Sequence, residues 1–397
     1  MKNREPKVQN QRIAIPRLPR ELSSDRPSAA SYASPLIPHA RRPRLGFLGV
    51  GWIGRHRLEA LARSGVAEIA AISDTSSENA LAASRLAPGA LVVDSLEALL
   101  ETETEGIVIA TPSSLHAEQA ITALEHGKAV FCQKPLGRTA EETQRVIGAA
   151  RRSDLLLGVD LSYRYPTGTR RIHELCRQGA LGEIFAADLV FHNAYGPDKP
   201  WFYERHLSGG GCLMDLGTHL VDLALWCLDF PLVVNVTSRL FAQGKPLKTP
   251  ADTVEDYALA RLDLANGAVV TLACSWKLPA GRDAVISGSF YGTKGGAAFH
   301  NLDGSFYDFV AEQFQGTKRT ELAAGAEEWG GRAGVDWAQR LANGVNFDPE
   351  TENLGTVAQT LDAVYASADG AQSAKPVLTD PAYAGIEFAA HGQPVAA

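Results

Sequence analysis

The chain has 397 residues, enough for two domains with substantial cores, and 45% of its residues are hydrophobic, which is ordinary for a globular protein. No apolar run approaches the roughly 20 residues of a membrane span, so we expect no membrane insertion. Residues 1–44 carry ten Lys or Arg against three Asp or Glu, and because the whole chain has a net charge of −7, the remainder carries −14. Such an acidic body argues against nucleic-acid binding as the main task.

Residues 1–43 are rich in arginine and contain seven prolines. They lack the apolar stretch of a signal peptide, and the prolines would break the amphipathic helix of a transit peptide. We predict an extended or flexible arm, partly of polyproline type. The arm either stays free or wraps the acidic body or a partner subunit.

The five cysteines are scattered along the chain and form no C-x-x-C pair. An odd number without such spacing is typical of a reducing compartment and predicts neither a disulfide framework nor a structural zinc site. We therefore expect a cytoplasmic protein that holds no metal.

An ordered domain is predicted from Arg44 onward, beginning with a glycine motif between a strand and a helix. Residues 45–50 form a short apolar run suited to a buried parallel strand, and G-V-G-W-I-G (49–54) leads into a helix over 55–64. A second apolar run, 68–73, ends at Asp74, 20 residues beyond Gly54. Strand, glycine motif, helix and an acid at that spacing together predict dinucleotide binding.

Each position of this motif has an expected role. Gly49 allows the tight turn, Gly51 lets the backbone approach the pyrophosphate, and Gly54 lets helix and strand pack closely. Amides at the start of the helix would bind the phosphates, and the acid would bind the ribose diol. The residues predicted to bind the dinucleotide here are Gly49, Gly51, Trp52, Ile53, Gly54 and Asp74.

The cofactor is expected to be NAD rather than NADP. Asp74 would repel a 2′-phosphate, and no Lys or Arg that could neutralise one follows until Arg85.

Helices and strands continue to alternate up to residue 159. The predicted helices are 76–86, 95–101, 115–126 and 139–152, and the predicted strands are 91–93, 106–110, 129–132 and 155–159. Ser113 and Thr139 are expected N-caps, the latter with Glu142 in a capping box. This rhythm predicts a doubly wound parallel sheet, which binds ligands beyond the carboxyl ends of its strands. Thr111, Lys134 and residues 160–164 follow strand ends and should face that cleft.

From residue 183 the pattern changes to longer strands, which predict a second, mainly antiparallel domain. The predicted strands are 183–195, 232–241, 254–264, 268–277, 284–291 and 305–309. Asn266-Gly267 is a hairpin turn signal, and residues 351–369 are again helical in pattern. We predict an arm over 1–43, a dinucleotide-binding domain over 44–165, a substrate-binding and oligomerisation domain over 166–377, and a tail over 378–397.

The apolar helix predicted over 209–229 begins with three glycines and carries four polar or aromatic residues on one stripe. Asp215, His219, Asp222 and Trp226 stand at i, i+4, i+7 and i+11. Buried polar groups need partners, so Asp215 and His219 either satisfy each other in a core or belong to a site. A metal pair is not favoured because no third ligand is nearby.

The chain resembles the Gfo/Idh/MocA oxidoreductase family over roughly residues 44–377. The motifs that carry the resemblance are G-V-G-W-I-G (49–54), A-T-P-S-S-L-H (110–116), Q-K-P (133–135), S-Y-R-Y (162–165) and G-G-G-C-L-M-D-L-G-T-H-L-V-D (209–222). The resemblance implies that Lys134, Asp215 and His219 form the catalytic set. It extends the cofactor set to Thr111, Pro112, His116, Gln133, Lys134 and Arg164.

One position departs from the family pattern. Gln133 stands where the family usually has Glu before the lysine. A neutral amide still forms hydrogen bonds but no longer compensates the charge of Lys134, which leaves the pKa of Lys134 open.

The expected reaction is hydride transfer between nicotinamide and a secondary hydroxyl or carbonyl group of a sugar, an inositol or a sugar derivative. His219 would take the hydroxyl proton, Lys134 would stabilise the developing alkoxide, and Asp215 would bind a neighbouring hydroxyl. Asp222 either orients His219 or lies in solvent. The predicted substrate residues are Lys134, His192, Asn193, Tyr195, Trp201, Asp215 and His219, although the four from the 192–201 segment are equally explained by loop packing.

Two alternatives stay open. One is a dinucleotide-binding sensor of the same fold without catalysis, and the other is a sugar oxidoreductase with tightly held cofactor. The resemblance also implies a homodimer or homotetramer that uses the open face of the second sheet.

Overall fold

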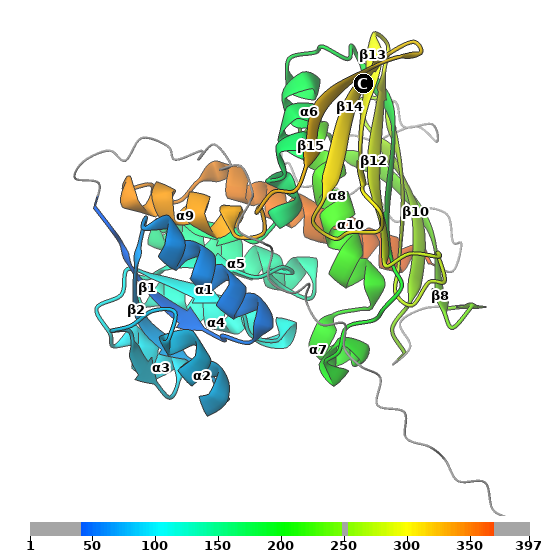
Figure 1. Cartoon of the computed structure of the whole chain (residues 1–397). Coiled ribbons are helices and arrows are strands. Elements are labelled where there is room, and N and C mark those ends of the chain that lie inside the picture. Colours follow the sequence, from blue (N-terminus) through cyan, green and yellow to red (C-terminus); the bar gives the residue numbers. More distant parts are fainter. Residues whose placement is uncertain (1–40, 248–252, 369–397) are drawn as a thin grey trace, which may run out of the picture. The chain divides into compact units, whose positions relative to one another are not determined.

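The computed structural model describes residues 41–247 and 253–368, which form a parallel sheet followed by a mostly antiparallel one (Figure 1). The predicted fold class is confirmed. The predicted arm, except for residues 41–43, and the whole predicted tail lie outside the described residues. In the described ranges, no helix is long and apolar enough to cross a membrane.

The first sheet has six parallel strands in the order β3-β2-β1-β4-β5-β6. They are β1 (Arg44–Leu48), β2 (Glu68–Ser73), β3 (Leu91–Val93), β4 (Gly106–Ile109), β5 (Ala129–Cys132) and β6 (Leu157–Val159). The apolar residues of β1, β2, β4 and β5 are almost entirely buried, as expected for strands covered on both faces, whereas Leu91 and Val92 of the edge strand β3 are exposed. The order reverses between β1 and β4, which opens a crevice for a ligand at their carboxyl ends.

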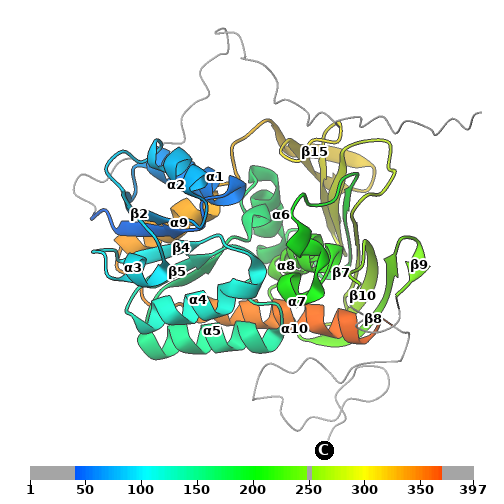
Figure 2. The same cartoon turned by 90° about the horizontal axis from the view of Figure 1, so that it is seen from below.

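Helices cover both faces of this sheet (Figure 2). They are α1 (Trp52–Ser64), α2 (Ser77–Ser84), α3 (Leu96–Leu100), α4 (Ser113–Glu125) and α5 (Ala140–Ser153). The core on one face takes residues from α1 and α2, and the core on the other takes residues from α3, α4 and α5.

The two predicted helix caps have different outcomes. The Thr139 side chain accepts a hydrogen bond from the Glu142 amide, as predicted. The Ser113 cap is wrong, because Pro112 occupies the cap position and Ser113 is buried in the first turn of α4. The first turn of α4 therefore has no side-chain cap.

A 3-10 helix, η1 (Ser162–Arg164), and α6 (Thr167–Arg177) lead to a nine-stranded sheet in the order β15-β14-β13-β12-β7-β11-β10-β8-β9. The strands are β7 (Ile184–Asn193), β8 (Val233–Ala242), β9 (Lys245–Pro246), β10 (Tyr257–Leu264), β11 (Val269–Ser275), β12 (Ala284–Gly292), β13 (Gly295–Asn301), β14 (Phe309–Gln315) and β15 (Lys318–Gly325). In this second sheet, β7 and β11 are the one pair of described strands that run parallel. Helix α6 packs on β13, β14 and β15, and α8 (Thr218–Cys227) packs on β7 and β11.

The hairpin predicted at Asn266-Gly267 joins β10 to β11. The core face of β11 carries Val270, Leu272 and Cys274, in agreement with the alternation of the sequence. The strand predicted over 305–309 is wrong, because residues 305–308 form a turn held by the Ser305 hydroxyl and β14 begins at Phe309. Strands β13 and β15 were not predicted.

The chain returns to the first sheet near its end, which the predicted division at residue 165 does not account for. Helix α9 (Arg332–Ala342) packs on α1, and its Trp337 ring lies 5.6 Å from the Phe131 ring. A methyl group at Gly106 or Gly158 would strike that indole at 2.7 Å, so these glycines make room for it. Helix α9 therefore belongs to the core of the dinucleotide-binding domain.

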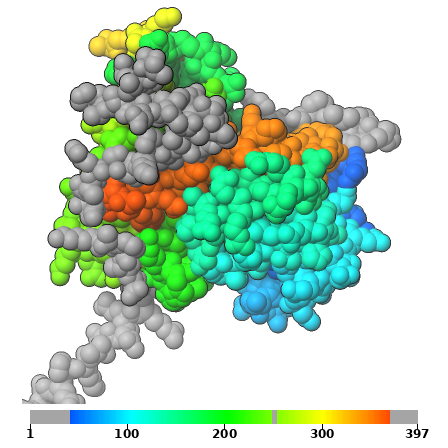
Figure 3. Space-filling view, turned by 180° about the vertical axis from the view of Figure 1, so that it is seen from behind, coloured from blue at the N-terminus to red at the C-terminus, as the bar shows by residue number. Residues whose placement is uncertain are grey.

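Helix α10 (Asn353–Ala366) follows a 3-10 helix, η4 (Pro349–Glu352), and joins the two sheets. It packs on α5 at one end and on α8 and β8 at the other. Figure 3 shows it as an orange-to-red band between the cyan residues of the first domain and the green residues of the second.

Candidate active site

The glycine motif forms a tight turn that leaves the start of α1 open. Gly49 has φ 85°, and a Cβ at Gly54 would lie 2.2 Å from the Gly49 carbonyl oxygen, so both positions require glycine. A Cβ at Gly51 would meet only open space. No side chain caps α1 and no acid occupies its first turn, which contains Trp52 and Ile53. The free amides therefore suit an anionic group such as a pyrophosphate.

Asp74 stands beside this turn at the end of β2. Its carboxylate accepts hydrogen bonds from the Val50 amide at 2.7 Å and the Ser76 amide at 2.8 Å. The acid is thus held at the carboxyl end of β2, beside the glycine turn, where a ribose diol is bound in folds of this type. The residues present fit a dinucleotide.

A lysine and an acid meet across the boundary between the two domains. Lys134 follows β5, and its Nζ donates to the Asp215 carboxylate at 2.5 Å and to the Asp215 main-chain oxygen at 2.7 Å. The other carboxylate oxygen of Asp215 accepts from the Trp276 indole at 3.0 Å. Both carboxylate oxygens are therefore engaged, and the core pairing considered between Asp215 and His219 does not form.

Asp215 lies in a π-helix, η3 (Leu213–Gly217), which runs directly into α8. This irregular turn sets Asp215 off from the regular helix that carries His219 and Asp222. Single π turns are frequently found at functional sites. The helical stripe predicted from the sequence is therefore interrupted after its first member.

The glycines before this helix seat it against the protein. A Cβ at Gly210 would lie 1.9 Å from the Tyr365 hydroxyl, and a Cβ at Gly211 would lie 1.9 Å from the Glu255 carbonyl oxygen. Protein atoms therefore occupy the space beside both glycines.

Glu255 anchors the start of the helix. It is fully buried, and one of its carboxylate oxygens accepts from the Gly211 amide, the Leu213 amide and the Tyr365 hydroxyl, each at 2.9 Å. Burial raises the pKa of its carboxyl group, although these hydrogen bonds oppose the shift. Glu255 thereby fixes the main chain only a few residues before Asp215.

His219 is 6% exposed and packs against the Tyr163 ring at 4.7 Å. Its Nδ1 atom is buried without a hydrogen-bond partner in the described residues. Burial, and then the charges of Lys134 and Arg57, hold the pKa of His219 well below its usual value. The imidazole is therefore neutral at neutral pH and able to accept a proton.

Asp222 neither orients His219 nor lies in solvent. It is 1% exposed, and its carboxylate pairs with the Arg164 guanidinium through both oxygens. Arg164 also lies over the rings of Trp226 and Phe230. These contacts use Arg164 inside the second domain, so the expectation that it binds the cofactor is not supported.

Gln133 is buried beside Lys134 and binds another acid. Its Nε2 donates to the Asp160 carboxylate at 2.5 Å, and Arg57 Nε donates to the same oxygen at 2.6 Å. The neutral amide is thus matched to a neighbouring carboxylate.

His116 holds two loops together. It is 1% exposed, and its ring nitrogens each lie 2.7 Å from a main-chain oxygen, that of Thr111 and that of Pro135. The expectation that His116 binds the cofactor is corrected, because both nitrogens are taken within the protein. Thr111 and Pro112 remain at the end of β4, and the Thr111 hydroxyl donates to Gln119 at 2.6 Å.

The predicted substrate segment divides between two faces of the second sheet. His192 binds Ser275 at 2.8 Å and stacks on Tyr257, on the face opposite the buried Phe191. The substrate assignment of His192 is therefore corrected, since α8 lies on the Phe191 side.

Later in the segment, Phe202 and Tyr203 pack on Trp276, the partner of Asp215. Trp201 stacks on Phe202, whose ring meets Trp276 edge-on. Asn193 accepts from the Tyr195 amide at 2.7 Å, and the Tyr195 hydroxyl binds Asp283. This loop is thus connected to the site through an aromatic contact.

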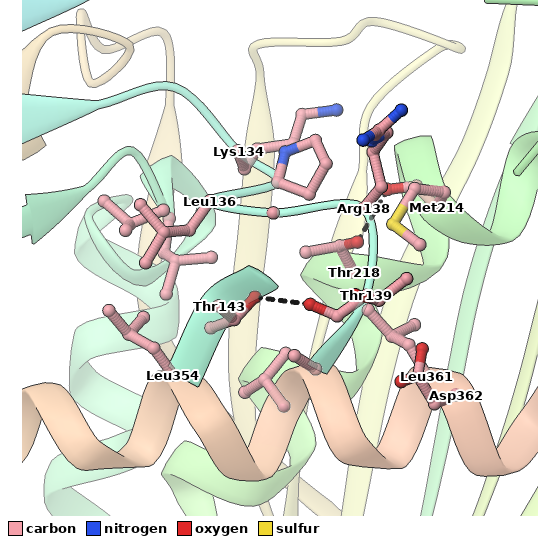
Figure 4. A pocket seen from close by; sticks show the side chains of 16 residues that line it. Lys134, Leu136, Arg138, Thr139, Thr143, Met214, Thr218, Leu354, Leu361 and Asp362 are labelled. Carbon is pink, nitrogen blue, oxygen red and sulfur yellow. Dashed lines mark hydrogen bonds between the residues drawn. The ribbon is translucent and has the colours of Figure 1, made fainter. Parts of the chain in front are cut away.

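A cavity lies on the far side of the loop that carries Lys134 (Figure 4). It is lined by Leu136, Met214 and α10 residues such as Leu354 and Leu361, and the Lys134 side chain points away from it. Its walls are mostly apolar, so the polar chemistry lies on the other side of this loop.

Five residues of the site were not singled out from the sequence: Arg57, Asp160, Tyr163, Glu255 and Trp276. Asp160 and Tyr163 lie in the 160–164 region that was expected to face the cleft. No local pattern distinguishes the other three, because their partners come from distant parts of the chain.

Two family models match the chain. The model described as "Oxidoreductase family, NAD-binding Rossmann fold" matches residues 44–161, and the model described as "GFO/IDH/MocA C-terminal domain" matches residues 169–298.

Known proteins agree with these matches. D-glucoside 3-dehydrogenase of Escherichia coli (strain K12) is 30% identical over 241 residues, which cover 58% of this chain and 69% of that protein. The structure of GenD2 from gentamicin A biosynthesis, in complex with NAD, has a TM-score of 0.70 at 25% identity and covers 84% of this chain and 97% of GenD2. KijD10, a 3-ketoreductase from Actinomadura kijaniata in complex with NADP, shares the fold with a TM-score of 0.71 at 23% identity, covering 82% of this chain and 98% of its own.

Proposed function

The chain belongs to the Gfo/Idh/MocA family of oxidoreductases, and we propose that it transfers a hydride between NAD and a secondary hydroxyl or carbonyl group of a sugar, an inositol or a sugar derivative. The observation that carries this proposal is the contact of Lys134 with Asp215 across the two domains, beside a neutral His219.

The three side chains divide the work on the substrate. His219 is neutral, so it takes the hydroxyl proton as the alkoxide carbon is oxidised. The Lys134 ammonium donates a hydrogen bond to the developing negative oxygen. Asp215 holds Lys134 and binds an adjacent hydroxyl group, which suits a polyol with neighbouring hydroxyls.

The glycine turn, the amides of α1 and Asp74 would hold the dinucleotide, whose nicotinamide supplies the hydride acceptor or donor. Asp74 supports NAD over NADP, because its carboxylate would repel a 2′-phosphate. Thr111, Pro112 and Gln133, at the ends of β4 and β5, would line the nicotinamide half of the cleft.

We propose a cytoplasmic homodimer or homotetramer. The face of the second sheet opposite α8 exposes Leu259 by 46% and Tyr291 by 40%, and the half-buried Val190 and Val285 lie on the same face. Exposed apolar side chains on one face of a sheet support burial against a second copy.

Replacement of Lys134 tests the catalytic assignment. A screen of sugars, polyols and inositols with NAD and NADP would first identify a substrate by absorbance of the reduced cofactor. Lys134→Ala should then lower kcat about a hundredfold or more and leave NAD affinity nearly unchanged, because the lysine stabilises charge in the transition state.

Lys318→Ala, on the edge strand β15, is the matched control and should keep wild-type rates. An unchanged rate in Lys134→Ala would end the catalytic assignment. Bound cofactor that never turns over with any sugar or polyol would favour a sensor.

A further inference from the structure

Three elements of the dinucleotide-binding domain bring together a buried polar cluster directly before the catalytic lysine. Arg57 comes from α1, Gln133 from the end of β5 and Asp160 from the end of β6. The Arg57 and Gln133 side chains both donate to the same Asp160 oxygen, at 2.6 Å and 2.5 Å. Asp160 is 1% exposed and its two partners are 7% exposed.

Charges in this region balance in pairs. Arg57 is paired with Asp160, and Lys134 with Asp215. Gln133 stands between the pairs and adds no charge. A carboxylate at position 133 would face the Asp160 carboxylate at hydrogen-bond distance, where two buried like charges repel strongly. The cluster therefore has room for one negative charge, which stands at position 160.

Fold packing alone does not account for Asp160. Its second oxygen is buried and accepts no hydrogen bond within the described residues, and an incompletely bonded buried carboxylate lowers stability. The arrangement instead fixes Gln133, the residue before Lys134, through its main chain and its side chain. The Gln133 main-chain amide donates to the Ile109 oxygen at 2.9 Å, and the Gln133 side chain donates to Asp160.

We propose that Asp160 is a positioning residue for Lys134. Through Gln133, and paired with Arg57, it fixes the end of β5 so that the Lys134 ammonium reaches Asp215. Gln133 and Asp160 then form one amide–carboxylate pair, in which the acid can occupy either position but not both. The expected effect of Asp160 on turnover rests on the proposed function. The expected effect of Asp160 on the position of Lys134 does not.

A charge-swap cycle tests the pair with four proteins: wild type, Gln133→Glu, Asp160→Asn and the double variant Gln133→Glu/Asp160→Asn. The first measurement is kcat and KM with the substrate found in the screen. The second is the rate at which acetic anhydride modifies Lys134, followed by mass spectrometry, which requires no turnover.

Asp154→Asn is the matched control. Asp154 also accepts a hydrogen bond from a side-chain amide, that of Asn346 at 2.9 Å, but this contact is exposed and involves no residue of the buried cluster. This variant should leave kcat and Lys134 modification at wild-type values.

Each single variant should lower kcat about tenfold or more with a smaller change in KM, and should speed Lys134 modification, because the lysine is released from Asp215. The double variant should recover both quantities to within about threefold of wild type, the non-additivity expected of groups in direct contact. If a single variant does not fold, Gln133→Met, which removes the amide without adding charge, should show the same faster modification.

Additive losses in the double variant would overturn the proposal, and so would equal Lys134 modification in all four proteins. A double variant that recovers stability but not kcat or Lys134 protection would reduce the cluster to a structural role. If the wild type turns over no sugar or polyol, the proposed function fails, and Lys134 modification alone decides the role of Asp160.

Discussion

Lys134 and Asp215 are 81 residues apart in the chain, yet their side chains form the contact on which the proposed chemistry depends. The resemblance to the Gfo/Idh/MocA family made these two residues predictable from the sequence as members of the expected catalytic set. The partner of each residue was not. Asp222 binds Arg164, a residue 58 positions away, and His192 lies on the opposite face from α8.

Asp74 offers a test of cofactor choice at the same scale. Asp74→Ala should weaken NAD binding about tenfold and reduce the preference over NADP, because the variant loses the ribose contact and the repulsion of a 2′-phosphate. Fluorescence titration with NADH and NADPH measures both effects. Asp94→Ala, at the end of β3, is the control, and tighter binding of NADPH than NADH by the wild type would reject the NAD assignment.

At the scale of elements, the start of the helix that carries Asp215 is fixed by contacts with Glu255. Glu255 accepts two amides of this turn, and Gly211 lies against the main chain of Glu255. The sequence predicted a helix here from its apolar pattern. It did not predict the π turn, because that turn depends on contacts with Glu255, Trp276 and Lys134.

Gly211→Ala tests this element. The added methyl group would lie 1.9 Å from the Glu255 oxygen, so the helix start must shift, at a cost of about 2 kcal/mol or more in the free energy of unfolding. Because Asp215 is four residues away, kcat should fall as well. Gly148→Ala in α5 is the control: its nearest neighbour is the end of the flexible Arg152 side chain, and the substitution should be neutral or slightly stabilising. Equal denaturation midpoints for the two variants would contradict this role of Gly211.

At the scale of the described molecule, the last helices tie the two sheets together. Helix α9 completes the core of the first domain, and α10 contacts α5, α8 and β8. The change of strand pattern predicts a division at residue 165. The return of the chain to the first domain through α9 has no corresponding pattern in the sequence. Strand β15 was missed because it is largely exposed and lacks an apolar run.

A half-buried histidine makes the stability of the folded chain depend on pH. Burial, aided by Arg177 and Arg164, lowers the pKa of His173 to about 4, and its ring stacks on Trp226 in α8. The unfolded chain takes up this proton near pH 6.5, whereas the folded chain does so only near pH 4. The stabilisation is therefore complete above pH 6.5 and is lost as the pH falls from 6.5 to about 4.

Urea denaturation midpoints between pH 7 and pH 4.5 measure this loss. The midpoint of His173→Gln should fall less steeply than that of wild type as the pH is lowered over this range. At pH 7 the variant should be less stable than wild type, because the ring stacking is altered. His206→Gln, an exposed histidine of α7 (Arg205–Ser208), should follow the wild-type slope. Parallel slopes in all three proteins would show that His173 does not contribute.

The resemblance to the Gfo/Idh/MocA family supplied the proposed catalytic set, and the sequence by itself determined the two kinds of sheet and the dinucleotide motif. These depend on local periodicity and on short spacings, in which the buried face of a strand or the turn before a helix leaves its mark within a few residues. Only the tertiary structure decided which charges pair, which face of the sheet His192 occupies and why a neutral side chain suits position 133. Those outcomes depend on side chains that are distant in sequence and adjacent in space, because a buried charge is stable only beside the partner that the fold brings to it.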